Sequence, residues 1–297
     1  MLQITHVYKE FGDLTAVSDL NFSLGSGEVL GLIGQNGAGK STTFKMILSF
    51  LRPTHGDILF NDHSISVDDL DLIGYMPEER GLYLDMTIKQ QVLYFASLHN
   101  YDKKKALADL TYWMDKLAVK GRLNDKIKSL SKGNQQKVQL ISSFIHHPKL
   151  LILDEPFSGL DPVNTELLIE AVLDLKRQGT SIIFSSHDMR NVERLSTKLL
   201  LLINGHTRLS GDIQTIKSSF GKTNLYLENA FSYDEINSMN GVINIQQDYP
   251  GYHIVFDTEE SANEALDKAK KTNALTGYRL FEPDLDSIFK QVTQENK

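Results

Sequence analysis

Apolar residues gather in short continuous runs along the first two thirds of the chain, at residues 29–33, 150–153 and 181–184. Polar or turn residues bound each run, and such runs are typical of parallel strands that helices cover on both faces. Helices are predicted near residues 164–177 and 189–195, between or after the later runs. This order predicts an α/β fold with a mostly parallel sheet as its core.

A different pattern opens the chain, where polar and apolar residues alternate at residues 2–7 and 20–24. Together with a short strand and turn at residues 58–62, this alternation predicts an antiparallel β subdomain. From residue 87 to residue 120 the apolar residues recur at helical spacing instead. We therefore expect a helical subdomain over about residues 85–150.

The pattern changes again near Gly211 and Asp212, and residues 221–297 form a second predicted domain. Its elements are a strand at 225–227, a helix at 233–239, strands at 242–246 and 252–256, a helix at 259–270, a strand at 277–281 and a helix at 285–293. The βαββαβ order predicts a small α+β domain of the ferredoxin-like kind. We find no glycine loop, metal-ligand cluster or catalytic grouping in this part of the sequence.

Composition narrows the possible functions. The 297 residues allow about two domains with sizeable cores. A net charge of −7 argues against a dedicated nucleic-acid binder, because no basic stripe offsets the acidic excess. The chain has no cysteine, which excludes disulfides, thiolate metal sites and thiol catalysis.

The N-terminus, MLQITHVYKEF, lacks the basic-then-apolar pattern of a signal peptide. The longest apolar stretches, such as residues 150–153 and 199–203, are far shorter than the about 20 residues needed to cross a bilayer. We therefore expect a cytoplasmic protein, and any role at a membrane would come through a partner.

The residues GQNGAGKS at positions 34–41 match the phosphate-binding pattern GxxxxGK(S/T) and follow the apolar run at 29–33. Glycines let backbone N–H groups point at an anion, and the helix expected at 42–50 adds the partial positive charge of its N-terminus. Lys40 can reach the β- and γ-phosphates, and the Ser41 hydroxyl can ligate Mg²⁺. The predicted nucleoside triphosphate site consists of Gly34, Gln35, Asn36, Gly37, Ala38, Gly39, Lys40, Ser41 and Thr42.

Two adjacent carboxylates end the apolar run at 150–153, in the sequence LLILDEP. Ligands bind at the carboxyl ends of strands in an open α/β sheet. Asp154 can therefore hold Mg²⁺, and Glu155 can polarise the attacking water. The alternative interpretation is a solvated turn, but two adjacent carboxylates at the end of a strand are costly unless they serve such a purpose.

Three further features narrow the choice among phosphate-loop proteins. In LSKGN, at residues 130–134, Ser131 and Gly133 open a helix whose N-terminus could bind an anion. SGLD, at residues 158–161, follows the two acids directly, and His187 ends the next predicted strand. A lone histidine usually belongs to a core or a surface, but one at this strand end can reach a γ-phosphate.

With these motifs in order, residues 1 to about 215 resemble the ATP-binding subunit of an ABC (ATP-binding cassette) transporter. GQNGAGKS is similar to the Walker A motif, LLILDEP to the Walker B motif, LSKGN to the signature motif LSGGQ, SGLD to the D-loop, and His187 to the switch histidine. Residues 74–83 resemble the Q-loop region of exporters that handle sodium, antibiotics or peptides, and residues 282–289 resemble the tail of that branch.

The chain departs from the family pattern at three places. Glu78 stands where the family has the Q-loop glutamine, so it would add a negative charge at the Mg²⁺ site, or else pair with Arg80 or face the membrane subunit. Lys132 and Asn134 replace glycine and glutamine in the signature, where Lys132 would approach the partner's γ-phosphate or point to solvent. The aromatic residue that stacks on adenine, commonly tyrosine, matches Phe11, and Tyr8 is the second candidate.

The resemblance implies ATP and Mg²⁺ as cofactors of an ATP hydrolase. It also implies that Glu155 and His187 are catalytic residues and that Ser41, Glu78 and Asp154 are metal ligands.

In the family, each nucleotide lies between the Walker A loop of one subunit and the signature helix of the other. The resemblance therefore implies that Ser131, Gly133 and Asp161 bind ATP in trans across a two-fold homodimer. ATP would close this dimer and hydrolysis would open it, while the helical region around residues 85–115 would carry the movement to an integral membrane permease. The protein would then be peripheral on the inner face of the cell membrane.

Other classes of ATPase fit the sequence less well. A soluble ABC-type ATPase of translation or iron–sulfur assembly is the main alternative, but the translation factors resemble two fused cassettes and this chain has one. A metabolic kinase with a phosphate loop would lack both LSKGN and His187.

Overall fold

A computed structural model describes residues 1–79 and 81–294 of the chain. The chain divides between Gly211 and Asp212 into two units, and each unit has a hydrophobic core of its own. Among the described residues, no helix combines the length and the apolar character needed to cross a membrane.

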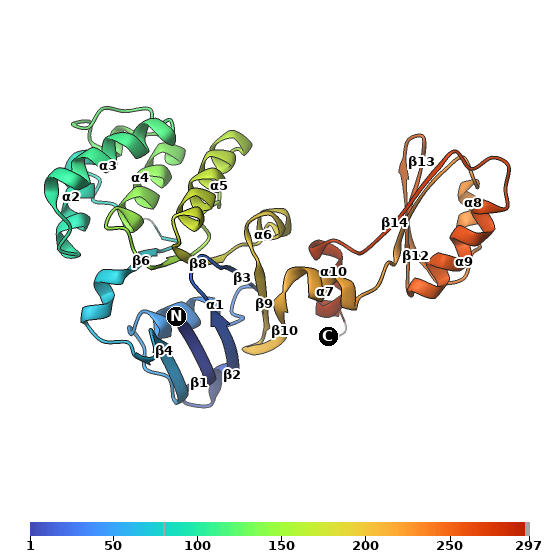
Figure 1. Ribbon diagram of the computed structural model, residues 1–297, viewed down its shortest axis with the longest axis horizontal. Coiled ribbons are helices and arrows are strands. Elements are labelled where there is room, and N and C mark those ends of the chain that lie inside the picture. The colour runs from blue at the N-terminus through green and yellow to red at the C-terminus, as the bar shows by residue number, and fades with distance from the viewer. Residues whose placement is uncertain (80, 295–297) are drawn as a thin grey trace. The chain divides into compact units, whose positions relative to one another are not determined.

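The first unit is built on a mixed sheet of ten strands in the order β5-β4-β1-β2-β10-β9-β3-β8-β7-β6 (Figure 1). Its parallel part consists of β3 (Val29–Ile33), β6 (Ile73–Met76), β7 (Leu150–Leu153), β8 (Ser181–Ser185) and β9 (Lys198–Ile203). Every residue of β3, β7 and β8 is buried, which explains the uninterrupted apolar runs. The helices that follow these strands most closely are α1 (Lys40–Ile47), α5 (Pro162–Arg177) and α6 (Met189–Leu195).

The antiparallel part consists of β1 (Leu2–Phe11), β2 (Leu14–Leu24), β4 (His55–Phe60) and β5 (His63–Ser64), and β10 (His206–Asp212) pairs with β2 in parallel. Strands β1 and β2 are longer than the alternation predicts. His6 and Asp19 have left-handed φ angles of 49° and 47°, and the register between the strands shifts nearby. Such bulges interrupt the period of two, so the pattern does not predict the full length of either strand.

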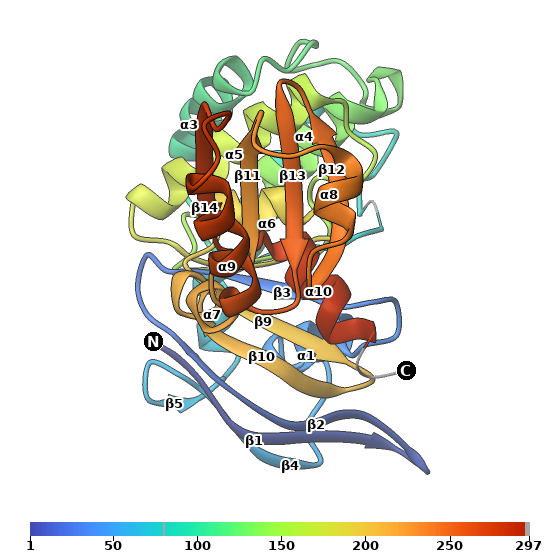
Figure 2. The same ribbon diagram turned by 90° about the vertical axis from the view of Figure 1, so that its right-hand side faces the viewer.

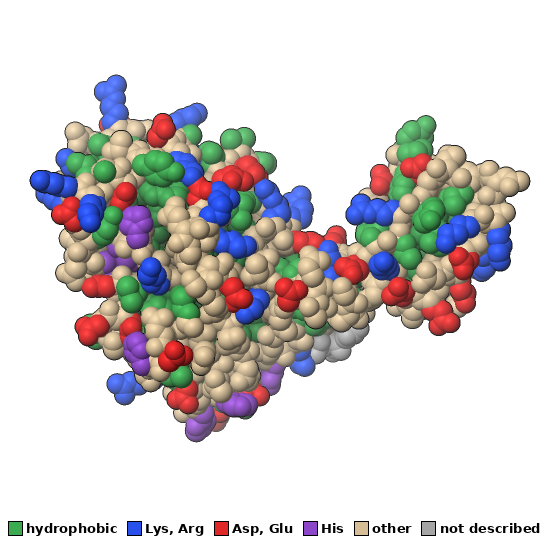
Figure 3. Space-filling model, in the orientation of Figure 1, with side chains coloured by type: hydrophobic (Ala, Val, Ile, Leu, Met, Phe, Trp, Pro, Cys, Tyr) green, Lys and Arg blue, Asp and Glu red, His purple; other side chains and the backbone are tan. Residues whose placement is uncertain are grey.

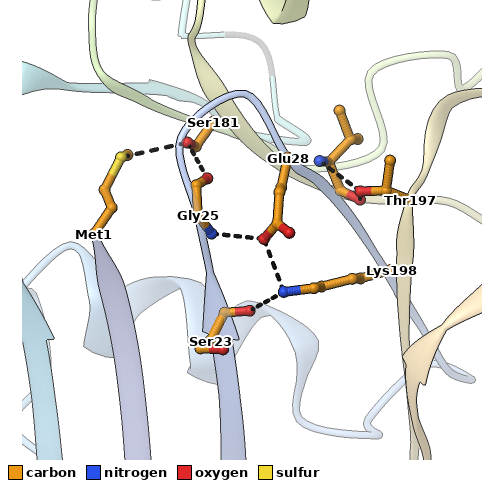
Figure 4. A network of polar contacts seen from close by, with 8 residues as sticks. Met1, Ser23, Gly25, Glu28, Ser181, Thr197 and Lys198 are labelled. Atoms are coloured by element: carbon orange, nitrogen blue, oxygen red, sulfur yellow. Dashed lines mark hydrogen bonds and ion pairs between the residues drawn. The ribbon is translucent and has the colours of Figure 1, made fainter.

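A network of polar contacts joins the turn after β2 to the parallel strands (Figure 4). The Glu28 carboxylate accepts hydrogen bonds from the backbone N of Gly25 at 2.6 Å and from Lys198 Nζ at 2.8 Å. Ser181 Oγ donates to the carbonyl oxygen of Gly25 at 2.6 Å. Because Ser181 begins β8 and Lys198 begins β9, these contacts fix the turn that leads into β3.

Three helices lie between β6 and β7 in the chain: α2 (Ile88–Leu98), α3 (Lys103–Lys116) and α4 (Lys132–Phe144). Short 3₁₀ turns occur at Asp68–Leu72 and Ile127–Ser129. Helix α2 packs against α3 and α4, and α4 packs against β6. Figure 1 shows the three helices as one group beside the sheet. Trp113 on α3 is 3% exposed, and its ring meets that of Phe144 on α4 with centroids 4.7 Å apart.

The second unit contains α7 (Ile213–Ser219), β11 (Asn224–Glu228), α8 (Tyr233–Asn237), β12 (Val242–Asp248), β13 (Gly251–Phe256), α9 (Glu259–Lys270), β14 (Gly277–Phe281) and α10 (Leu285–Gln294). Its sheet has the order β12-β13-β11-β14, and all neighbouring strands are antiparallel. Helices α8 and α9 cover one face of this sheet (Figure 2). From β11 to β14 the element order is the βαββαβ order that the sequence predicts, whereas α7 is not predicted.

Phe44 on α1 is fully buried in the core of the first unit. We expect Phe44→Ala to lower the free energy of unfolding by about 3–5 kcal/mol, because it leaves a cavity in a closely packed region. Thermal or urea unfolding followed by circular dichroism measures this loss. Phe50→Ala is the matched control: its ring is 64% exposed, so the loss should be about 1 kcal/mol or less. Equal losses of stability in the two variants would contradict the place of Phe44 in the core.

Candidate functional site

The phosphate-binding loop joins the end of β3 to the start of α1, and Gly39 is the N-cap residue of the helix. Gly39 has a φ of +104°, and a Cβ atom there would lie 2.6 Å from the carbonyl oxygen of Ala16. A Cβ atom at Gly34 would lie 2.5 Å from the carbonyl oxygen of Leu202. Both positions therefore require glycine, since neighbouring backbone leaves no space for a side chain.

The N-terminus of α1 lacks a side-chain cap. Gly39 offers no hydrogen-bond acceptor, and the first turn contains no acidic residue. By contrast, Ser131 and Asp161 cap α4 and α5 with side-chain oxygens. The first N–H groups of α1 and its partial positive charge are therefore available to an anion.

A pocket of about 410 Å³ opens over this loop. The predicted residues that line it are Gln35, Asn36, Gly37, Ala38, Gly39, Lys40, Ser41, Thr42, Phe11, Glu78, Asp154, Glu155 and His187. Gly34 begins the loop directly after β3 and does not itself line the pocket. The fold thus brings four separate parts of the chain to the phosphate loop.

Lys40 is buried in this pocket, with 8% of its surface exposed. Its Nζ donates hydrogen bonds to the carbonyl oxygens of Gly34 at 2.6 Å and Gln35 at 3.3 Å. Burial lowers the pKa of Lys40. The negative charges of Glu155, Asp154 and Glu78 oppose that shift. The ammonium group therefore hydrogen-bonds to its own loop and is attracted to the carboxylates of the pocket.

Asp154 follows β7 and is 4% exposed. Its Oδ2 accepts a hydrogen bond from Ser41 Oγ at 3.3 Å, and its Oδ1 accepts one from Ser185 Oγ at 2.7 Å. Ser185 Oγ also accepts a hydrogen bond from the backbone N of Glu155 at 2.8 Å. Ser185 therefore orients the Asp154 carboxylate and holds the backbone at Glu155. The sequence offers only one signal for it, a polar residue at the end of an apolar strand.

The oxygen atoms around Asp154 suit Mg²⁺. This ion is usually bound by one or two carboxylates together with substrate phosphates, rather than by a cage made of protein alone. Ser41 and Asp154 provide a hydroxyl and a carboxylate side by side, and Glu78 lines the same pocket. Among residues 1–79 and 81–294, no group of three or more His, Cys, Asp or Glu could hold a metal by itself. The donor set therefore fits a Mg²⁺ ion that nucleotide phosphates help to coordinate.

Glu155 and His187 form a pair at the edge of the pocket, with 3.1 Å between Glu155 Oε1 and His187 Nε2. Glu155 has a φ of +49°, a left-handed conformation that is uncommon for a residue with a side chain and that often occurs at functional sites. Burial raises the pKa of Glu155 to about 7 and lowers the pKa of His187. Glu155 can therefore exchange a proton near neutral pH while the imidazole is uncharged.

Phe11, the last residue of β1, is 47% exposed and lines the pocket. Lys9 Nζ lies 5.0 Å from the centroid of its ring. Leu14 and Ala16 also line the pocket, although the sequence pattern does not single them out. Their place follows from the turn between β1 and β2, which pairs Leu14 with Phe11.

Ser131, Gly133 and Asp161 do not line the pocket over the phosphate loop. Ser131 Oγ accepts a hydrogen bond from Asn134 Nδ2 at 2.9 Å, and Asp161 accepts one from the backbone N of Asn164 at 2.9 Å. A Cβ atom at Gly133 would lie 3.1 Å from Asn164 Nδ2. The three residues therefore form a separate group where α4 and α5 begin.

Glu78 is also a candidate for pairing with Arg80. Arg80 lies outside the residues that the structure describes.

Two family models match the chain: "ABC transporter" over residues 17–158, and "ATP-binding protein DrrA1-3-like, C-terminal domain" over residues 211–293. The chain is 42% identical over 289 residues to the uncharacterized ABC transporter ATP-binding protein YhaQ of Bacillus subtilis, and the match covers 97% of each protein. An uncharacterized ABC transporter ATP-binding protein of Alkalihalophilus pseudofirmus is also 42% identical, over 87% of this chain and 97% of that protein.

Solved structures have the same fold. An ATP-binding subunit of an ABC transporter, 29% identical, matches 74% of this chain and 93% of its own with a TM-score of 0.69. A nucleotide-free ATP-binding cassette at 22% identity matches 71% of this chain and 91% of its own with a TM-score of 0.64. The resemblance of the motifs to an ABC transporter subunit is therefore confirmed. The chain belongs to the ATP-binding proteins of ABC transporters, and it is an ABC transporter ATPase with a DrrA1-3-like C-terminal domain.

Proposed function

We propose that this ATPase powers an ABC exporter, in which closure of a dimer of ATP-binding subunits drives transport through a separate integral membrane permease. The observation that carries the proposal is a single pocket in which an uncapped helix N-terminus, Lys40 and the Glu155–His187 pair meet. The direction of transport rests on the resemblance of the C-terminal segment to exporters of sodium, antibiotics or peptides. In this role the protein acts on the inner face of the cell membrane.

The phosphate loop binds the β- and γ-phosphates of ATP. The backbone N–H groups at the start of α1 and the Lys40 ammonium supply the positive charge. Lys40 already lies against the carbonyl oxygens of Gly34 and Gln35, so its side chain reaches over the loop toward the phosphates. The exposed ring of Phe11 stacks on the adenine base.

Ser41, Asp154 and Glu78 are the residues that would hold Mg²⁺. When bound, the ion neutralises the charge that develops on the phosphate oxygens during transfer. Ser185 holds Asp154 Oδ1 in place through a hydrogen bond of 2.7 Å, while Oδ2 faces Ser41. This orientation presents Asp154 to the same side of the pocket as the Ser41 hydroxyl.

Glu155 is the general base for hydrolysis. Its carboxylate orients a water molecule and accepts a proton from it, as the water oxygen bonds to the γ-phosphorus and the bond from that phosphorus to the bridging oxygen of ADP breaks. A pKa of about 7 places Glu155 near the value at which such a transfer is efficient. His187, whose Nε2 lies 3.1 Å from Glu155 Oε1, is close enough to this carboxylate to contact the γ-phosphate.

Ser131, Gly133 and Asp161 bind the nucleotide of a second copy of the chain. The support is their position: they lie together at the N-termini of α4 and α5, and they do not line the pocket of their own subunit. A helix N-terminus is suited to a phosphate of the partner subunit. Lys132 is exposed at the first position of α4, where it adds a positive charge.

The C-terminal unit is a ferredoxin-like module that tunes dimerisation and takes no part in the chemistry. Its antiparallel order β12-β13-β11-β14 supports the ferredoxin-like assignment. Hydrophobic side chains reach its surface (Figure 3), and Ile243, Tyr249 and Tyr278 are 66%, 90% and 54% exposed.

Lys40→Ala tests the phosphate site. We expect the variant to lose ATP affinity by about 100-fold or more, because a charge-assisted contact to two phosphates is lost. The fold should stay intact, since Lys40 does not belong to the hydrophobic core of the unit. Lys45→Ala, which changes an exposed lysine on the same helix, is the control. If titration calorimetry showed an unchanged ATP affinity for the Lys40 variant, the role of Lys40 in phosphate binding would be refuted.

Glu155→Gln separates binding from chemistry. The variant should bind MgATP and hydrolyse it about 10²–10⁴-fold more slowly, because the amide cannot accept the proton. It should then accumulate as an ATP-bound dimer, which light scattering detects. Glu170→Gln, at an exposed position of α5, should behave like the unchanged protein. A monomeric Glu155 variant at high ATP and protein concentrations would count against closure of the dimer by ATP alone.

A chain shortened to end at Lys217 tests the role of the C-terminal module. We expect this shortened chain to keep its ATP affinity within about threefold, since all residues of the pocket precede its end. Its dimerisation should change, which sedimentation in the presence of ATP measures. Circular dichroism establishes that the shortened chain is folded. Complete loss of ATP binding in a folded, soluble sample would show that the module contributes to the site.

A further inference from the structure

The loop that carries Glu78 is held by buried glutamine side chains from two helices. Gln139 on α4 is 5% exposed, and Gln91 on α2 is fully buried. A buried amide is stable only when its polar atoms find partners. Both amides find them on the backbone of the segment between Pro77 and Tyr83.

Gln139 holds the backbone on both sides of Glu78. Its Nε2 donates a hydrogen bond to the carbonyl oxygen of Pro77 at 2.9 Å and lies 3.4 Å from the carbonyl oxygen of Glu79. One side chain thus fixes the residue before Glu78 and the residue after it. The position of the Glu78 carboxylate in the pocket depends on this backbone.

Gln91 holds the far end of the same loop. Its Oε1 accepts a hydrogen bond from the backbone N of Tyr83 at 3.0 Å, and its Nε2 lies 3.5 Å from the carbonyl oxygen of Gly81. A cavity of about 180 Å³ adjoins the loop, and Pro77, Gly81, Gln91 and Gln139 are among its lining residues. Hydrogen bonds from the two glutamines therefore hold the loop beside this cavity.

The same face of α4 also holds the loop after β7. Gln136, three residues before Gln139, is 7% exposed and donates to the carbonyl oxygen of Pro156 at 2.7 Å. Pro156 directly follows Glu155. Residues three apart on a helix share a face. One helix therefore holds both the loop of Glu78 and the loop of Glu155, and its N-terminus carries the signature residues.

We propose that Gln139 is a positioning residue for the metal site, which keeps the Glu78 carboxylate where it can ligate Mg²⁺ beside Asp154. The inference rests on the proposed role of Glu78 as a metal ligand. Without the amide, the carbonyl oxygens of Pro77 and Glu79 lose this donor, and the adjoining cavity gives the loop room to move. Glu78 then leaves the metal site although every residue that lines the nucleotide pocket is still present.

Titration calorimetry with ATP, once in EDTA and once in Mg²⁺, separates nucleotide binding from the contribution of the metal. Gln139→Met replaces the amide with an unbranched apolar chain of similar length. We expect the gain in ATP affinity that Mg²⁺ provides to fall by about tenfold, as for other residues that orient a metal ligand. The affinity in EDTA should change by less than about twofold.

Ser143→Ala is the matched control, because Ser143 is also buried on α4 but donates within its own helix, to the carbonyl oxygen of Leu140 at 2.7 Å. This variant should change neither affinity. Should Gln139→Met unfold at the assay temperature, Gln139→Glu serves instead, since it keeps the length and replaces the donor with an acceptor. A Gln139 variant that behaves like Ser143→Ala would overturn the positioning role.

Glu78→Gln distinguishes failure of this inference from failure of the proposed metal site. If Glu78 ligates the metal, Glu78→Gln reduces the Mg²⁺-dependent gain, and the double variant with Gln139→Met loses little more, because both act through one carboxylate. If Glu78→Gln leaves the gain unchanged, the metal role of Glu78 is wrong, and the positioning role falls with it. If Glu78→Gln reduces the gain while Gln139→Met does not, only the positioning role is wrong.

Discussion

The active region of this protein depends on a helix N-terminus that its own chain leaves uncapped. Helix α1 begins where β3 ends, and glycines at its start keep side chains away from the first N–H groups. Because β3, β8 and β7 are parallel neighbours, their carboxyl ends lie at the same edge of the sheet. Asp154, Glu155 and His187 follow two of these strands, so they meet the phosphate loop although they are far from it in sequence.

The second constraint is the balance of charge in a buried space. Burial disfavours charged groups of both signs, so it lowers the pKa of Lys40 and raises that of Glu155 to about 7. The attraction between the ammonium and the carboxylates opposes both shifts. Hydrogen bonds then determine which groups are held where: Ser185 orients Asp154, and Gln139 holds the backbone around Glu78. The polar residues behind the pocket are therefore as important to its geometry as the residues that line it.

The sequence by itself determined the parallel core, the phosphate loop and the order of elements from β11 onward in the C-terminal unit. These features depend on local patterns, because a strand buried on both faces must be apolar at nearly every position. The expected run at residues 150–153 has the same bounds as β7, and the expected helix at 189–195 has the same bounds as α6. The motif residues at the ends of β3, β7 and β8 could be proposed as a site because ligand chemistry at a strand end uses few residue types.

Only the tertiary structure decided the rest. Bulges near His6 and Asp19 break the alternation of β1 and β2, so their length depends on pairing with each other and not on local pattern. Ser185 and Gln139 are ordinary residues in the sequence, and they gain a role only when burial places them against Asp154 and against the loop of Glu78. A hydrogen bond between residues distant in the chain leaves no periodic signal, and for that reason the support behind the pocket could not be predicted from the sequence.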